Sequence, residues 1–481
     1  MKKLLVVICC SLTMTILNAQ ETLFTKIDSY LTEGVANGFS GSILIQADDQ
    51  IILNKGYGLA NKERSIKNEI NTVFDIGSNT KQFTSAAIMR LEEKGLLNVE
   101  DSLAMFFDNL PKEKRQITIH QLLTHTSGLQ ESIGGDFDLI PEDQFIEEVL
   151  NSNLVFAPGS SFNYSNIGYS LLAKIIEETS GQSYESFVKE QFFDPIGMRQ
   201  TGYQLPEWDV NNLAHGYNRN IMHQGTMISR YQEQGEVSWH LKGNGGLQST
   251  NMDLLNWLRE INSGAILSPQ SIEKWTTPYV KEINNYYAYG WGVYDPQQRE
   301  NVIYHNGGNG AFSNTIIWDM DTNDMIIFSC NSSSPSLEQV PYEIEKMMIS
   351  PNYIPQPIKK NPYYFLQSFM SINDPDQDHQ MLETLKREYQ QAISSSSLLN
   401  RMGYLTLRQG NKDWAYKLFK LNTELFPDDG NVWDSLGEYY IMSEQIDEAK
   451  KCLIKAITIG TERSCDWCES SINKLKQLIL N

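Results

Sequence analysis

The pattern of apolar and polar residues predicts strands at the two ends of the first 350 residues. An alternating segment over residues 39–53 is interrupted by the polar turn Asp48-Asp49-Gln50, which predicts an antiparallel hairpin. Four later segments with strand character are bounded by Gly, Asn or Asp, namely residues 287–294, 302–304, 315–318 and 325–329. We therefore expect one sheet whose strands come from distant parts of the chain.

Between these strands, apolar residues recur at helical spacing. Residues 84–97 carry Ala87, Ile88 and Leu91 on one face, and Gly95 offers a C-terminal stop. Further helices are predicted over residues 119–123, 143–150 and 167–178. Strands at both ends of this part of the sequence, with helices between them, predict an α/β sandwich. In such a fold helices flank an antiparallel sheet, and an all-helical subdomain is inserted.

Beyond Pro351 the strand pattern ends. Pro355, Pro357 and Pro362 punctuate the chain after Pro351, so residues 351–395 are predicted to form a linker and a packing helix. Over residues 396–481, Gly403 recurs 34 residues later as Gly437, and Ala415 recurs as Ala449. This period and these residue types resemble the tetratricopeptide repeat, a unit of two helices.

Two such repeats cannot bury their own apolar faces, because each unit contacts only its neighbours and about three are needed for stability. A capping helix is expected after the second repeat, where Ile472, Leu475 and Leu478 share one face. Two interpretations of the tail stay open. It is either a structural cap or a surface that docks a protein or peptide partner.

The first residues predict export. Met1-Lys2-Lys3 is a basic start, residues 4–16 are apolar, and Ala19 ends a small-residue cleavage site, which is the pattern of a signal peptide over residues 1–19. No later run of about 18 apolar residues occurs, so no membrane span is expected. We expect a periplasmic or secreted protein whose main domain covers residues 20–350.

Composition narrows the possible ligands. The 481 residues carry a formal net charge of −20, which repels a phosphate backbone and argues against nucleic acid as a partner. The seven histidines show no metal-ligand spacing, so neither a metal nor an organic cofactor is expected. Cys465 and Cys468 are close enough in sequence to form a disulfide, with unpaired thiols as the alternative.

The first candidate for chemistry is Ser78-Asn79-Thr80-Lys81, at the start of the first predicted helix. Residues three apart share a helix face, so the amine of Lys81 can reach the hydroxyl of Ser78. Serine needs an adjacent base to become a nucleophile. Lysine can serve only if burial or neighbouring groups bring its pKa down toward neutrality. Alone, this pattern also fits an ordinary N-cap serine.

Two further patterns supply complementary groups. In Tyr164-Ser165-Asn166 the phenol can relay a proton and the Asn166 amide can hold a substrate amide. The segment from Tyr304 to Gly308 is expected to end a strand, with His305 at the site. Gly307 and Gly308 there let a substrate lie against the strand edge, and a main-chain N–H can face an oxyanion. Each pattern is weak alone, and their combination indicates a serine hydrolase.

Together these motifs resemble the family of serine β-lactamases and penicillin-binding proteins. The similar branch holds class C β-lactamases, D-alanyl-D-alanine carboxypeptidases and related esterases. Supporting segments are residues 74–77, 122–129, 194–198 and 245–250. The resemblance covers roughly residues 22–345.

Carried over to the matching positions, the resemblance implies that Ser78 is acylated and that Lys81 accepts or modulates its proton. Tyr164 is implied as the relay of protons to the leaving group, and Asn166 as a ligand of the substrate amide. The N–H groups of Ser78 and Gly308 match the oxyanion hole. The choice of general base between Lys81 and Tyr164 stays open.

Many members of the family have Lys-Thr-Gly where this chain has His305-Asn306-Gly307. Because an imidazole replaces a permanent cation, we expect a D-Ala-D-Ala carboxypeptidase, D-amino-acid peptidase or esterase rather than an efficient β-lactamase. Its substrates are expected to be small molecules or peptides with an amide or ester bond. The alternative is a binding protein that acylates slowly or not at all and docks a partner through its tail. His125 is expected to hydrogen-bond within its own turn.

Overall fold

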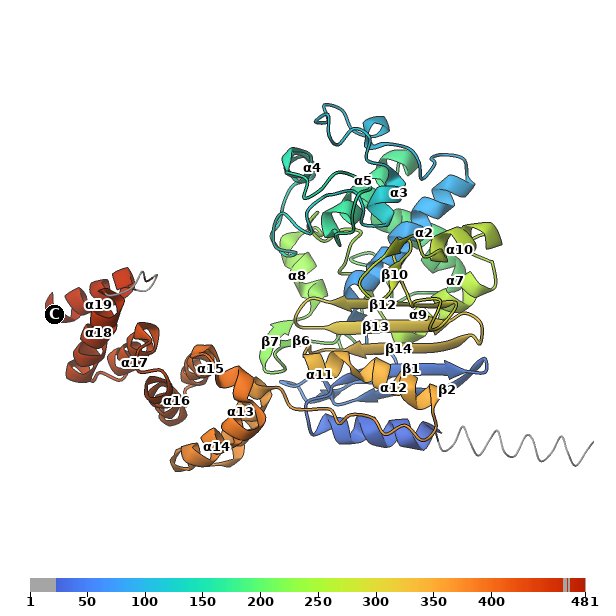
Figure 1. The fold of residues 1–481 in the computed structure, drawn as a ribbon. Helices are drawn as coiled ribbons and strands as arrows, with labels where there is room; N and C mark the ends of the chain where they lie inside the picture. Colours follow the sequence, from blue (N-terminus) through green and yellow to red (C-terminus); the bar gives the residue numbers. More distant parts are fainter. Residues whose placement is uncertain (1–22, 462–464, 466–467, 481) are drawn as a thin grey trace, which may run out of the picture. The chain divides into compact units, whose positions relative to one another are not determined.

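The computed structural model describes residues 23–461, 465 and 468–480. The chain separates into two compact units, Met1–Lys359 and Lys360–Asn481, shown in Figure 1. The expected signal peptide, residues 1–19, lies outside the described residues. Within the described ranges, no helix has both the length and the apolar character needed to cross a membrane.

The first unit is built on an eight-stranded antiparallel sheet with the order β2-β1-β14-β13-β12-β11-β10-β9. Its strands are β1 (Gly41–Ala47), β2 (Gln50–Tyr57), β9 (Val280–Lys281), β10 (Tyr286–Tyr287), β11 (Gly292–Val293), β12 (Val302–Gly308), β13 (Ser313–Asp319) and β14 (Asp324–Cys330). The predicted hairpin is confirmed as β1 and β2. Strand β1 also pairs with β14, so the early and late strands share one sheet, as expected.

Two strand predictions are corrected. Residues 287–294 do not form one strand, because Gly290, with a φ of +76°, turns the chain between β10 and β11. A Cβ at Gly290 would lie 2.8 Å from the main-chain oxygen of Lys81, so this turn passes close to the neighbouring helix. The strand predicted over residues 302–304 is longer than expected, because β12 pairs with β13 as far as Gly308; the segment from Tyr304 to Gly308 ends this strand, as predicted.

Side chains alternate between the two faces of the sheet. On β14, Ile326 and Phe328 pack with α12 (Val340–Ile349) and with a helix over residues 23–35. Ile327 of the same strand packs on the opposite face, in the cluster that contains α2 (Thr80–Glu93) and α9 (Asn251–Asn262). This arrangement confirms the expected sandwich of a sheet between helices, seen in Figure 1.

The inserted helical subdomain is built mainly from α3 (Ile119–Leu123), α4 (Glu142–Asn151), α5 (Asn166–Ser180), α6 (Tyr184–Val188) and α8 (Met227–Gln234). The other helical pieces of the first unit include the short turns Leu103–Met105 and Lys189–Phe193, α7 (Asp194–Ile196), α10 (Pro269–Thr276) and α11 (Pro335–Glu338). Three two-stranded ribbons complete this unit: β3 (Leu59–Asn61) with β4 (Ile66–Lys67), β5 (Phe74–Asp75) with β8 (Gln248–Ser249), and β6 (Gly216–Asn218) with β7 (Met222–Gly225).

The second unit is helical. It contains α13 (Pro362–Ile372), α14 (Asp378–Glu388), α15 (Ser397–Arg408), α16 (Lys412–Leu425), α17 (Gly430–Met442), α18 (Ile446–Thr461) and α19 (Cys468–Leu480). Pro362, expected in the linker, is instead the first residue of α13, where its missing N–H is harmless. Cys465 and Cys468 are joined in a disulfide.

Positions that are 34 residues apart occupy matching places in two successive helix pairs. A Cβ at Gly403 would overlap the ring of Phe419, and a Cβ at Gly437 would lie 3.2 Å from Leu453, so each glycine allows close approach of its partner helix. Ala415 and Ala449 are both fully buried. The identity of these pairs as tetratricopeptide repeats stays a prediction.

Candidate active site

Ser78 lies in a tight turn, Gly77–Asn79, between β5 and α2. Gly77 has a φ of +50°, and a Cβ there would collide with the main-chain nitrogen of Gly308. A Cβ at Gly307 would likewise overlap the carbonyl oxygen of Ile76. These glycines therefore allow the turn that carries Ser78 to lie directly against β12.

Lys81 stands in the first turn of α2 and is fully buried. Its Nζ lies 3.1 Å from Ser78 Oγ, 2.8 Å from Asn166 Oδ1 and 2.7 Å from the carbonyl oxygen of Asn244. Burial lowers the pKa of Lys81 well below its usual value, against the opposing effect of the nearby Asp136 and other carboxylates. The structure thus favours a neutral amine at this position.

A neutral amine has two N–H donors and one lone pair. The oxygens of Asn166 and Asn244 can only accept, so they take the two N–H groups of Lys81. The lone pair is then left for the third neighbour, the hydroxyl of Ser78. This is the geometry of a base beside its nucleophile.

Tyr164 lies beside both Ser78 and Lys81, and its hydroxyl hydrogen-bonds the Ser78 side chain. Its ring centroid is 4.7 Å from Lys81 Nζ. Burial raises the pKa of Tyr164 above its ordinary value of 10.0, and the hydrogen bond with Ser78 offsets only part of this effect. The phenol is therefore protonated at neutral pH and can donate a proton.

Asn166 is the first residue of α5, whose N-terminus is capped by the Ser165 side chain accepting from Gly168 N–H. The Asn166 side chain presents Oδ1 to Lys81. Its amide nitrogen points the other way and can donate to a substrate carbonyl.

His305 is buried on β12 beside these groups, with its ring centroid 6.4 Å from that of Tyr164. Its Nδ1 lies 2.8 Å from the main-chain oxygen of Asn306, so Nδ1–H donates there, and Nε2 lies 3.1 Å from the Tyr287 hydroxyl and accepts from it. Burial and the nearby Lys81 lower the pKa of His305 to about 3. The imidazole is therefore neutral and places no cation at this edge.

A cavity of about 310 Å³ joins these residues. It is lined by Ser78, Tyr164, Glu282, Tyr287, Gly292, Tyr304, His305 and Asn306. The structure thus brings together five of the predicted site residues from distant parts of the sequence: Ser78, Lys81, Tyr164, Asn166 and His305. Gly307 and Gly308 lie against the turn of Ser78. The arrangement can bring an acyl carbon to Ser78 with a base and an acid within reach.

The sequence profile of a known family, Beta-lactamase, matches residues 27–345. The chain belongs to the beta-lactamase family. It is a serine hydrolase of the group that includes penicillin-binding proteins.

Curated relatives of this beta-lactamase-family chain include penicillin-binding protein 4* of Bacillus subtilis, 28% identical over 65% of this chain and 71% of the relative. The putative penicillin-binding protein PbpX of the same species is 33% identical over 56% of this chain and 64% of the relative. The chain thus spans about two thirds of the length of these relatives.

Solved structures share the fold. An octameric penicillin-binding protein homologue from Pyrococcus abyssi is 27% identical, with a TM-score of 0.57 over 72% of this chain and 81% of that chain. D-alanine carboxypeptidase AmpC from Burkholderia cenocepacia is 21% identical, with a TM-score of 0.56 over 68% of this chain and 99% of that chain. The beta-lactamase fold over the first unit is therefore common to all of them.

Sequence reasoning missed several residues of this beta-lactamase-family site. Asn244 accepts a hydrogen bond from Lys81 through its main-chain oxygen. It directly precedes the Gly245-Gly246 segment that supported the resemblance, but any residue type can make a main-chain contact, so its side chain gives no signal in the sequence. His125 was expected to bond within its own turn, and this is wrong: its Nδ1 accepts from Ser165 N–H at 3.0 Å. Its ring lies 4.3 Å from that of Tyr164, so His125 supports the loop that carries the phenol.

Asp75 is a second missed residue, buried just before the nucleophile turn. Its Oδ1 accepts from Gly77 N–H at 2.6 Å and its Oδ2 accepts from Asn309 Nδ2 at 2.9 Å. The carboxyl thus ties the Ser78 turn to the loop that follows Gly308. Burial raises the pKa of Asp75 to about 7, against the lowering effect of these hydrogen bonds.

Glu63, His215 and His223 bring groups that can bind metals together, with ligand atoms within 4.8 Å of one another. His215 Nδ1 is 2.7 Å from His223 Nε2, and the ring centroids are 5.0 Å apart with planes inclined by 12°. For two rings whose nitrogens are this close, the centroids are farthest apart when the rings point at each other edge to edge. The observed centroid distance is near that maximum, so the line between the two nitrogens lies in both ring planes. The rings form an in-plane hydrogen bond, and their lone pairs do not converge on a common ion.

Proposed function

We propose that this serine hydrolase cleaves small amides or esters through a covalent acyl-enzyme on Ser78. The observation that carries the proposal is the coordination of Lys81 Nζ, with carbonyl oxygens of Asn166 and Asn244 on two sides and Ser78 Oγ on the third. A neutral amine held in this way accepts the Ser78 proton as Oγ bonds to the acyl carbon.

The remaining steps follow from the neighbouring groups. Main-chain N–H groups of Ser78 and Gly308 receive the negative charge that develops on the acyl oxygen, and one such donor is typically worth about 3 kcal/mol. Tyr164 gives its proton to the departing nitrogen or oxygen and regains one from the Lys81 ammonium. A water molecule then attacks the acyl carbon, gives its proton to the Lys81 amine, and Ser78 leaves with that proton.

The protonation state of His305, which lines the catalytic cavity, supports a proposal for the substrate class. His305 is neutral, so the edge of β12 offers hydrogen bonds and no cation to a substrate carboxylate. This disfavours an efficient β-lactamase, whose substrates carry a carboxylate, and favours an esterase or an enzyme that cleaves D-amino-acid amides; a D-alanine-type carboxypeptidase would have to hold its substrate carboxylate with neutral hydrogen-bond donors alone. The D-alanine carboxypeptidase among the solved structures with this fold is consistent with the proposal.

Covalent labelling tests the proposal. The protein is incubated with a fluorescent penicillin and with a p-nitrophenyl ester, and the adduct is located by mass spectrometry. We expect the label on Ser78, and no label on Ser78→Ala. Equal labelling of Ser78→Ala would refute the nucleophile assignment. A parent protein that labels but releases no product would favour the binding-protein alternative.

We further propose that the protein works outside the cytoplasm, after removal of residues 1–19, and that residues 396–481 are tetratricopeptide-like repeats. The basic and apolar start of the chain supports the first proposal. The matching places of Gly403 and Gly437 in successive helix pairs support the second.

A further inference from the structure

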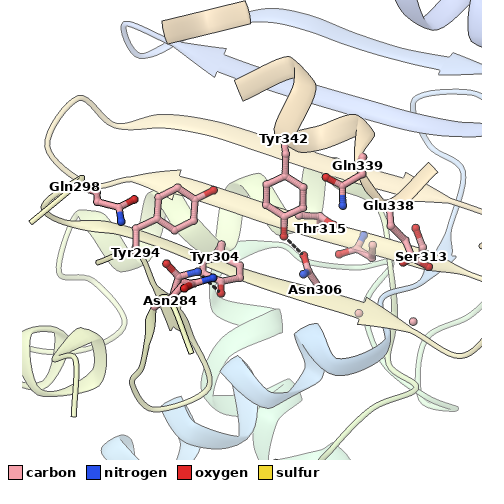
Figure 2. A pocket seen from close by; sticks show the side chains of 14 residues that line it. Asn284, Tyr294, Gln298, Tyr304, Asn306, Ser313, Thr315, Glu338, Gln339 and Tyr342 are labelled. Carbon is pink, nitrogen blue, oxygen red and sulfur yellow. Dashed lines mark hydrogen bonds between the residues drawn. The ribbon is translucent and has the colours of Figure 1, made fainter. Parts of the chain in front are cut away.

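A second cavity of about 820 Å³ lies on the face of the sheet that carries α12. Figure 2 shows its walls: Tyr304 and Asn306 from β12, Thr315 from β13, and Gln339 and Tyr342 on the helical side. The full lining is Asn284, Asn285, Tyr294, Gln298, Tyr304, Asn306, Gly307, Gly308, Ser313, Asn314, Thr315, Glu338, Gln339 and Tyr342.

This outer cavity adjoins the catalytic one. Tyr304 and Asn306 line both cavities. They flank His305 on β12, and successive strand residues point to opposite faces, so the strand presents His305 to the catalytic cavity and its neighbours to the outer one. A ligand bound at Ser78 can therefore extend past Asn306 into the outer cavity.

The lining is polar and almost uncharged. Asn, Gln, Ser, Thr and Tyr side chains dominate it, and Glu338 is its only carboxylate. No Lys, Arg or His lines the cavity, so nothing there neutralises an anionic ligand. Burial raises the pKa of Tyr342 to about 12, so its phenol is neutral as well. The occupant that matches this wall is an uncharged molecule rich in hydrogen-bonding groups.

One hydroxyl in the wall of the cavity has no partner, and one amide there has a donor that faces away from its neighbour. Ser313 is 5% exposed, and its hydroxyl makes no hydrogen bond in the described part of the chain. Asn306 Oδ1 accepts from the Tyr342 hydroxyl at 2.9 Å, which directs its Nδ2 donor away from Tyr342. A buried hydroxyl without a partner is costly, so Ser313 is an independent indication of a ligand.

Two tyrosines provide aromatic surface beside these groups. The rings of Tyr294 and Tyr304 lie 5.2 Å apart and are inclined by 59°. Their hydroxyls are already engaged, with Glu345 accepting from Tyr294 at 2.8 Å and Asn285 Nδ2 donating to Tyr304 at 3.0 Å. What they offer a ligand is therefore the ring surface, which suits the apolar C–H face of a sugar ring.

We propose that the outer cavity is a subsite for an uncharged sugar, so that the bond cleaved at Ser78 belongs to an acyl group carried on a glycan. Amides and hydroxyls both donate and accept, as sugar hydroxyls do. A peptide would instead be expected to pair its main chain with a free strand edge. The cavity offers side chains on a sheet face, and its strand β13 is paired on both sides. On β12 the residues after Tyr304 pair with β13 alone, and on the other side Gly307 and Gly308 lie against the turn of Ser78. The glycan link rests on the proposed hydrolase function.

Binding is measured on full-length Ser78→Ala protein, which removes the chemistry from the experiment. Triacetylchitotriose, maltotriose and trialanine are titrated by calorimetry. We expect saturable binding of at least one sugar and none of trialanine. Gln298→Ala is expected to weaken sugar binding about tenfold, the loss of one good hydrogen bond. Gln297→Ala is the matched control, because the neighbouring Gln297 is exposed and outside the cavity lining.

The outcomes separate the two proposals. If neither sugar binds, or if Gln297→Ala and Gln298→Ala weaken binding equally, the sugar subsite is wrong. Binding of trialanine that is sensitive to Gln298→Ala would make the cavity a peptide subsite and also overturn the proposal. Labelling of Ser78 in the parent protein reports on the hydrolase function alone, so sugar binding without labelling would reject only the link to acyl cleavage.

Discussion

At the residue scale, the protonation state of Lys81 decides whether Ser78 can be activated. Its burial and its two carbonyl neighbours favour the neutral amine. We predict that Lys81→Arg lowers the acylation rate about 10²–10⁴-fold, the usual contribution of a general base, because a guanidinium keeps its proton. Burst kinetics with a p-nitrophenyl ester measure this rate. Lys94→Arg, an exposed position beyond α2, is the control and is expected to behave like the parent.

The pH dependence of acylation follows from the same residue. Only the neutral amine accepts a proton, so the rate is expected to rise as pH increases through the pKa of Lys81. Because burial places that pKa well below 10.5, the rise is expected to be complete at a lower pH than for an exposed lysine. A rate that still climbs steeply toward pH 10 would contradict this assignment. The measurement is the rate of Ser78 labelling across buffers of constant ionic strength.

The raised pKa of Asp75 predicts how the free energy of unfolding depends on pH. Its pKa is raised from 3.8 to about 7 in the folded protein, so folding favours the protonated carboxyl. This contribution is fully present below about pH 4 and is lost as pH rises to about 7, a change of roughly 4 kcal/mol. Urea unfolding at several pH values is expected to show that decline. Asp75→Asn is expected to abolish it, whereas exposed Asp143→Asn is expected to retain it.

At the element scale, the turn before α2 and the end of β12 must touch for the site to form. We predict that Gly307→Ala lowers acylation at least about 10²-fold, since the new Cβ overlaps Ile76 O and displaces an oxyanion donor. Ser78 labelling measures the effect. Gly181→Ala is the control: its φ of +71° is similarly unusual for alanine, but the space beside it is open. It is expected to cost about 1 kcal/mol of stability and to leave labelling intact.

Elements differ in how far their sequence predicts them. The helix at Ile119–Leu123 has the predicted bounds, because Thr118 and Gln121 form a capping box that is visible in the sequence. Strands β10 and β11 are two residues each, too short for a periodic signal. Their separation depends on the close passage of Gly290 along α2, which is a tertiary contact.

At the scale of the whole molecule, the division into two compact units predicts that the first unit folds and functions without the second. A protein that ends at Lys359 is expected to fold and to keep the ester hydrolysis rate of the full chain, because all the catalytic groups and their contacts belong to the first unit. Circular dichroism, thermal melting and ester hydrolysis check this outcome. Loss of soluble protein would support the structural-cap interpretation of the tail.

The candidate site was predictable in part because its chemistry resides in residue types. Ser78 and Lys81 are three residues apart at the start of a helix, and helical geometry alone brings their side chains together. The convergence of Tyr164 and His305 on them could be inferred only through resemblance, since no local rule connects residues so far apart. Asn244 and Asp75 escaped notice, because one acts through its main chain and the other through burial.

The sequence by itself therefore determined several short-range features: the hairpin, the helix at Ile119–Leu123, the nucleophile motif and the period of the tail. The first helix was predicted over residues 84–97, and the structure has it four residues earlier, at Thr80–Glu93. Tertiary structure alone decided which groups are charged, because the pKa values of Lys81, Asp75 and His305 depend on burial by distant segments. It also decided where the outer cavity lies, since its walls come from separate strands and helices. Periodicity and capping act over a few residues, whereas desolvation and cavities are properties of packed segments.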